Sequence, residues 1–201
     1  MDPVRNPFAP GAGNPPPELA GRQAILDKAA IVLERTVQQR HAKSFMLVGL
    51  RGVGKTVLLN RIGQMAGERG LRWHLIESPE DKPLPELLVP ALRRILLALD
   101  NVATVGEAVR RGLRVLGSFA KSLKLKYEGL EVGIDVERGV ADSGDLDSDL
   151  ADLFVAVGEA AKAMRSGVVL LIDELQYVSE AELSSLIMPS IGPANGSCPL
   201  C

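Results

Sequence analysis

Residues 49–56 restrict what this chain can fold into more than any other stretch. They read Gly-Leu-Arg-Gly-Val-Gly-Lys-Thr, which is the G-x-x-x-x-G-K-[ST] spacing of a phosphate-binding loop. The apolar run ahead of the loop predicts a strand over 44–49, and apolar residues at helical spacing predict a helix from about Lys55 to about Glu68. A glycine-rich turn that matches by chance is the alternative. The register of strand, loop and helix argues against it.

The residue types of the loop suit a nucleoside triphosphate and Mg²⁺. Glycine accepts backbone conformations that side chains block, so consecutive N–H groups can turn toward phosphate oxygens. The N-terminus of the following helix adds its positive dipole end. We expect Lys55 to reach the β- and γ-phosphates and the Thr56 hydroxyl to bind Mg²⁺. The candidate nucleotide-binding residues of this segment are Gly49, Leu50, Arg51, Gly52, Val53, Gly54, Lys55, Thr56 and Val57.

A second motif lies far along the chain, where five apolar residues over 168–172 lead into Asp173 and Glu174. The run predicts a buried strand that presents both acidic side chains at its carboxyl end. Asp173 is then placed to hold Mg²⁺ beside Thr56, directly or through water, and Glu174 to orient and polarise the attacking water. Alone, such a run is weak evidence, but behind a complete phosphate loop it is strong. The predicted catalytic residues are Glu174 and Lys55, and the predicted metal ligands are Thr56 and Asp173.

Composition and charge fit one globular domain. Of the 201 residues, 46% are apolar and 24% are charged, and the length favours one domain over two. The net charge of −2 gives no overall indication of a nucleic-acid or acidic-membrane partner. The chain shows no signal-peptide core and no apolar run near the ~20 residues that span a bilayer, so we expect a cytoplasmic protein without a membrane partner. Cys198 and Cys201 give no disulfide framework, and as a single pair they make a poor zinc or redox site.

The rest of the chain predicts an α/β fold, in which a parallel sheet carries helices on both faces and binds nucleotide at the carboxyl ends of its strands. Asp145 or Ser143 is expected to cap a helix. The further expected elements are helices over about 23–39, 86–99 and 105–119, a helix that ends at about Arg165, and strands over 71–76 and 168–173.

A hairpin is predicted over 122–136, where apolar and polar residues alternate around Glu128 and Gly129. The hairpin and the helices within 86–119 are a candidate surface for a protein or DNA partner. The arginines of this region equally fit a solvated helix face, and the hairpin equally fits a decoration of the core.

Three segments together resemble the AAA+ ATPases: the loop at 49–56, the Asp173-Glu174 pair, and the box Pro-Glu-Leu-Ala-Gly-Arg at 17–22. The resemblance is strongest to Orc-like bacterial and archaeal AAA ATPases, and it covers about residues 4–188. It implies an ATPase core of the P-loop type with ATP and Mg²⁺ as cofactors, and it places Arg22 near the base. The resemblance to the Orc-like proteins also rests on three further segments, which are Asn-Pro-Phe-Ala-Pro-Gly-Ala-Gly at 6–13, Asp-Ser-Gly-Asp-Leu at 142–146 and Asp-Glu-Leu-Gln-Tyr at 173–177.

The resemblance ends near the C-terminus. AAA+ proteins continue past the Asp-Glu motif into a strand with a polar sensor residue, an arginine finger and a helical lid. Here a helix starts at about 181–188, but the prolines and glycines of 189–201 cannot continue it. We interpret this tail as a frameshifted end, which resequencing across the codon for Met188 tests; an intact frame through Cys201 in independent isolates contradicts it.

The expected organisation is an irregular lead-in over 1–17, an AAA+-like nucleotide-binding domain over 18–188 and the irregular tail over 189–201. Without the sensor strand, we expect an incomplete three-stranded sheet that leaves apolar surface exposed. The expected function is binding of Mg²⁺-ATP with weak or absent hydrolysis. The alternatives are a non-enzymatic module that binds protein or DNA and a truncated product without function, and the oligomeric state stays open.

Overall fold

The computed structural model describes residues 21–40, 42–50, 52–99, 106–125 and 136–187. The expected lead-in over 1–17, most of the predicted hairpin and the tail over 189–201 lie outside these residues.

The predicted helices and two of the three predicted strands are present, with small shifts at their ends. The loop helix and the last strand have the predicted bounds, whereas the strand expected over 71–76 lies one residue later and the first helix ends two residues sooner. The elements are α1 Gln23–Val37, α2 Lys55–Glu68, β1 Arg72–Glu77, α3 Leu84–Leu99, α4 Glu107–Ser122, α5 Leu146–Ala163, β2 Val168–Asp173, the short 3-10 helix η1 Leu175–Tyr177, and α6 Glu180–Ile187.

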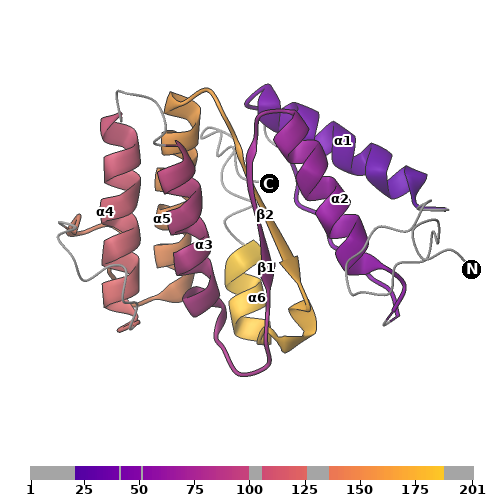
Figure 1. Ribbon diagram of the computed structural model, residues 1–201. Helices are drawn as coiled ribbons and strands as arrows, with labels where there is room; N and C mark the ends of the chain where they lie inside the picture. The colour runs from indigo at the N-terminus through magenta and orange to yellow at the C-terminus, as the bar shows by residue number, and fades with distance from the viewer. Residues whose placement is uncertain (1–20, 41, 51, 100–105, 126–135, 188–201) are drawn as a thin grey trace, which may run out of the picture.

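A parallel pair of strands lies between two groups of helices. β1 and β2 pair in register from Arg72 opposite Val168 to Glu77 opposite Asp173, so both strands end at the same edge. Figure 1 shows α1 and α2 on one side of the strands, α3 and α5 on the other, and α4 outermost beyond them. The structure is therefore an α/β arrangement in which helices cover both faces of a small parallel sheet.

Each face of the sheet supports its own apolar core. Along β2, Val168 belongs to the core formed with α3, α4 and α5, whereas Val169 and Leu171 belong to the core formed with α1 and α2. Successive side chains of a strand point to opposite faces, so an uninterrupted apolar run is needed where both faces are covered. The composition of β2 follows from its place between two helix layers.

Residues 42–50 form no strand, so the predicted strand over 44–49 is wrong. Phe45 and Leu47 pack partly buried against the α1–α2 core, whereas Met46 is 50% exposed and Val48 90%. The alternation typical of a strand is thus present, but a strand also needs a hydrogen-bonded neighbour. Within the described part of the chain, β1 and β2 pair only with each other, and the sheet has two strands instead of the three predicted.

The start of α5 is held by two acidic residues with different roles. Asp145 is the N-cap, as one of the two predicted candidates, and its carboxylate accepts a hydrogen bond from the Ser148 N–H at 3.2 Å. Asp149, fully buried one turn later, accepts hydrogen bonds from the backbone N–H groups of Ser143 and Gly144 and from the hydroxyls of Ser143 and Ser122. The Asp149 carboxylate therefore ties the loop before α5 to the end of α4.

Candidate functional site

The phosphate loop enters α2 through two glycines with left-handed backbone conformations. Gly52 has φ 81° and Gly54, the residue before α2, has φ 83°. A Cβ at either position would meet no atom within 4 Å, so the backbone angle and not lack of space requires glycine. The Gly54 carbonyl accepts the first helical hydrogen bond from the Leu58 N–H at 3.1 Å. The free N–H groups of this turn are thereby placed at the N-terminus of α2.

Lys55 folds its side chain back over the loop. Its Nζ donates to the carbonyl oxygens of Gly49 at 3.1 Å and Leu50 at 3.0 Å. The Lys55 ammonium group therefore adds positive charge beside the N-terminus of α2, and helix N-termini generally favour anions such as phosphate.

The two sequence motifs meet at Thr56 and Asp173. The Thr56 hydroxyl donates to Asp173 Oδ2 at 2.5 Å, across 117 positions of sequence. Asp173 ends β2 and is 6% exposed, and its other oxygen accepts the backbone N–H of Glu174 at 2.9 Å. The structure thus places a hydroxyl and a carboxylate side by side at the carboxyl edge of the sheet, next to the loop.

Glu174 turns the chain sharply after β2. Its φ of 56° lies in the left-handed region, which residues other than glycine rarely adopt. The Glu174 backbone N–H donates to the Asp173 carboxylate, and the Glu174 carbonyl accepts a hydrogen bond from the Tyr177 N–H at 3.1 Å. The Glu174 carboxylate accepts a hydrogen bond from the Gln176 side-chain amide. These bonds offset the strain of the turn and fix the direction of the carboxylate.

Arg22 approaches the loop from the residue before α1. Its guanidinium donates to the Val53 carbonyl at 2.7 Å, which ties α1 to the loop. A cavity of about 230 Å³ lies beside this contact, between α1, the residues ahead of the loop and the start of α2. Its lining residues are Arg22, Ile25, Lys28, Phe45, Met46, Leu47, Val48, Val53, Lys55 and Leu58.

The comparison with protein families matches residues 18–188 to the AAA ATPase domain. This match spans most of the chain and includes both motifs. The chain belongs to the AAA ATPase domain family. The comparisons with curated proteins and with solved structures gave no match.

Membership of the AAA ATPase family implies Mg²⁺, and the donor set can be tested for it. No three His, Cys, Asp or Glu side chains gather as a metal site anywhere in the described ranges. Mg²⁺ at a nucleotide needs less, because phosphates and waters supply most of its ligands. The neighbouring oxygens of Thr56 and Asp173 at the mouth of the loop fit that requirement.

Of the other predicted site residues, Val57 lies partly buried in the first turn of α2, and Arg51 lies outside the described residues. Sequence reasoning missed two neighbours of this AAA ATPase site. Gln176 contacts the Glu174 carboxylate, and Ser78, just after β1, donates its N–H to the Asp173 carbonyl at 3.2 Å. Gln176 belongs to the Asp-Glu-Leu-Gln-Tyr segment at 173–177, which was the available signal in the sequence, whereas nothing in the sequence singled out Ser78.

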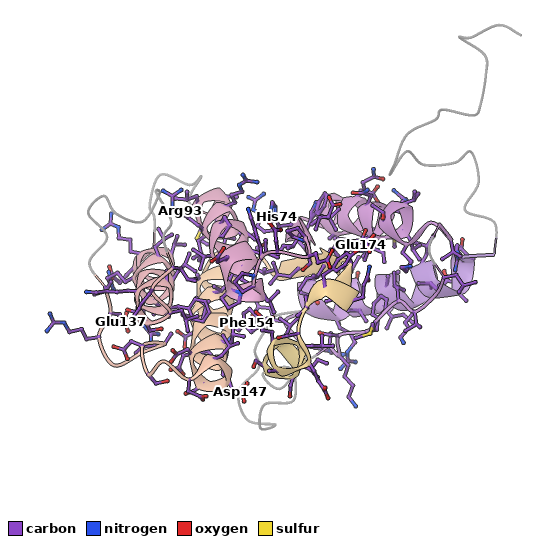
Figure 2. The ribbon with its side chains drawn as sticks, turned by 90° about the horizontal axis from the view of Figure 1, so that it is seen from below. His74, Arg93, Glu137, Asp147, Phe154 and Glu174 are labelled. Carbon is purple, nitrogen blue, oxygen red and sulfur yellow. The ribbon has the colours of Figure 1, made fainter. Side chains whose placement is uncertain are left out.

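Two of the three arginines of α4 are paired with acidic side chains. Arg111 contacts Glu137 and Glu159, and Arg114 contacts Glu107 and Glu137. The hydrogen bond with Glu137 raises the pKa of Arg111, and the hydrogen bond from Arg114 lowers the pKa of Glu107. Figure 2 shows Glu137 in a different part of the molecule from Glu174. These pairs fit the solvated-face interpretation and add no support for a DNA surface on α4.

Within its described residues, the AAA ATPase domain has no helix that is both long and apolar enough to cross a membrane.

Proposed function

We propose that this AAA ATPase domain binds ATP as its Mg²⁺ complex at the loop formed by residues 49–56. The observation that carries the proposal is the hydrogen bond from Thr56 to Asp173. It joins the end of the loop to the end of the buried strand, so that the two motifs form one site. A chance glycine-rich turn gives no reason for this contact.

In the proposed complex, Lys55 leaves the carbonyl oxygens of Gly49 and Leu50 and binds the β- and γ-phosphates. The N–H groups of Gly52, Val53 and Gly54 and the N-terminus of α2 bind the phosphate oxygens. Thr56 and Asp173 hold Mg²⁺, directly or through water. When bound, the metal supplies positive charge that offsets the charge of the phosphate oxygens. Arg22 lies near the base, on the α1 side of the loop.

The proposal assigns hydrolysis to Glu174, whose carboxylate accepts a proton from the attacking water. The bond from Gln176 orients that carboxylate. Phosphoryl transfer gains greatly from an arginine at the transferred phosphate. In many nucleoside triphosphatases a second protein supplies that arginine, so we expect this chain alone to bind Mg²⁺-ATP with slow or no turnover.

We further infer that residues 18–188 form a single domain with the three-layer αβα arrangement of the P-loop nucleoside triphosphatases that carry an additional strand. The helices on both faces of β1 and β2 support this. The Orc-like relationship rests on the sequence segments alone.

The test is titration calorimetry of Mg²⁺-ATP into the full chain and into Lys55→Ala. We expect micromolar binding that the substitution abolishes, because it removes the ammonium group at the phosphates. Lys82→Ala is the matched control, since Lys82 is an exposed lysine in the loop before α3. Binding that survives in Lys55→Ala, or no binding by the folded wild-type chain, would overturn the proposal.

A further inference from the structure

Among the described residues that line the cavity beside the loop, three side chains are positively charged and none is acidic. Arg22, Lys28 and Lys55 line it, together with apolar residues from α1, 45–48 and α2. Two of the cations already have oxygen partners, because Arg22 donates to Val53 and Lys55 to Gly49 and Leu50. Among the described residues, the Lys28 ammonium has neither a hydrogen bond nor an ion pair. It lies over the Phe45 ring, 5.2 Å from the centroid.

The position of Lys28 is fixed by helix geometry. Arg22, Ile25 and Lys28 follow one another at intervals of three residues, so they share a face of α1 and all line the cavity. Arg22 anchors the start of this face to the loop. Lys28 lies six residues after Arg22 on this face, where its ammonium is above the ring of Phe45, another lining residue of the cavity.

The rest of the cavity suits a flat ligand with an apolar face. Met46, Val48 and Val53 are 50%, 90% and 36% exposed, although all three are apolar. Exposed apolar side chains that line a concave surface with a few charged groups are typical of a ligand pocket. If the phosphates lie at Lys55, the nucleoside of the same molecule extends into this space.

Resting on the proposed function, we propose that Lys28 binds the base of the nucleotide by donating to an acceptor atom on its edge. An ammonium group has three donors and no acceptor, so it recognises a ring nitrogen or a carbonyl oxygen. The Phe45 ring and the exposed apolar residues lie against the rest of the base. In this proposal Lys28 binds the nucleoside end of the ligand, and Lys55 binds its phosphates.

The test compares two ligands that differ only in the base, Mg²⁺-ATP and the Mg²⁺ complex of ribose 5′-triphosphate. Lys28→Met keeps the length of the side chain and removes the charge. We expect about a five- to tenfold rise in the Kd for ATP and a change within about twofold for ribose 5′-triphosphate. Lys28→Arg keeps donors and charge and is expected to restore most of the ATP affinity. Thermal unfolding should be unchanged, since Lys28 is exposed and, among the described residues, its ammonium makes no hydrogen bond or ion pair that the substitution removes.

Two results would overturn the assignment. Equal weakening for both ligands means that Lys28 acts on the phosphates through its charge alone, and an unchanged Kd for ATP means that it does not contact the nucleotide. Lys55→Ala keeps this separate from the proposed function, because it is expected to abolish binding of both ligands. If the wild-type chain binds neither ligand, the proposed function fails and this inference fails with it.

Discussion

Thr56 donates its hydroxyl hydrogen to Asp173 at 2.5 Å, which joins the first turn of α2 to the last residue of β2. Asp173 is 6% exposed, so this bond and the bond from the Glu174 N–H satisfy a carboxylate that water scarcely reaches. The same two side chains are the metal ligands in the proposed function, which would give this contact a functional role in addition to its structural one.

Thr56→Val is expected to weaken Mg²⁺-ATP binding by about tenfold or more, because it replaces the hydroxyl with a methyl group of similar shape. Binding of ATP in excess chelator should change little, since Thr56 acts through the metal. The measurement is calorimetry with Mg²⁺ and with EDTA. Unfolding should also become easier, by about 1–3 kcal/mol, because Asp173 Oδ2 loses its donor.

Thr56→Ser is the matched control, since it keeps the hydroxyl and loses only a methyl group. It should retain the Mg²⁺-dependent affinity. An equal loss of affinity in Thr56→Val with and without Mg²⁺ would contradict the metal role and leave only the structural one.

Gly63→Ala is expected to destabilise the protein by about 1–3 kcal/mol. Trp73 on β1 packs so closely on α2 that a Cβ at Gly63 would lie 2.5 Å from the indole carbons Cε3 and Cζ3. The higher helix propensity of alanine, worth about 1 kcal/mol, offsets only part of this clash. Chemical unfolding, followed by the fluorescence of Trp73 as the only tryptophan, measures the change.

Gly67→Ala is the control one turn along the same helix. A Cβ there would meet Trp73 Nε1 at 3.2 Å, a contact that a small shift of the ring relieves. A stability loss as large as that of Gly63→Ala would show that the indole is not the cause.

The sequence predicts those parts of the structure that depend on interactions between residues close together in the chain. The bounds of β2 and α2 follow from residues within each segment, and the meeting of Thr56 and Asp173 follows from a known motif geometry. The segment 44–49 has the composition of a strand, but a strand is completed by a neighbour that its own residues cannot specify. Phe45 and Leu47 are nevertheless partly buried, with the alternation of a strand but without its hydrogen-bonded ladder.

Contacts between side chains far apart in sequence are the part that the sequence could not predict. Lys28 lies over Phe45 only because α1 packs beside residues 42–48, and nothing in either segment indicates the other. The same holds for Gly63, because an isolated glycine within a helical pattern does not show which side chain packs against it. The structure shows it as the place where Trp73 approaches the α2 backbone.

Asp149→Asn is expected to cost about 1–3 kcal/mol of stability or more. Each carboxylate oxygen of Asp149 accepts two hydrogen bonds, from Ser143 at Oδ1 and from Ser122 and Gly144 at Oδ2. In the amide side chain of this variant, an NH₂ group replaces one of the two carboxylate oxygens. That NH₂ group then faces hydrogen-bond donors in a fully buried position, where it cannot accept their hydrogen bonds. Thermal or urea unfolding measures the loss.

Asp147→Asn provides the comparison for Asp149→Asn, because Asp147 is an exposed acid in the same first turn of α5. It loses only the favourable interaction with the helix dipole, a few tenths of a kcal/mol to about 1. Similar losses in both variants would mean that charge near the helix N-terminus, and not the buried hydrogen bonds, accounts for the effect.

His74 is expected to make stability depend on pH. It lies partly buried on β1, where burial first and the positive charge of Arg94 second lower its pKa below the ordinary value of 6.5. The unfolded chain takes up a proton as the pH falls through about 6.5, whereas the folded chain takes it up only at lower pH. Acidification therefore favours the unfolded state, and the contribution of His74 to stability is present above pH 6.5 and declines below it.

The measurement for His74 is the urea midpoint of wild type and His74→Gln between pH 7.5 and 5.5. Glutamine keeps a polar side chain of similar reach without a titrating proton, so its curve should fall less steeply with acid. Arg94→Gln is expected to reduce the slope partly, since it removes the smaller cause and leaves burial in place. Parallel curves for wild type and His74→Gln would assign the pH dependence to other groups.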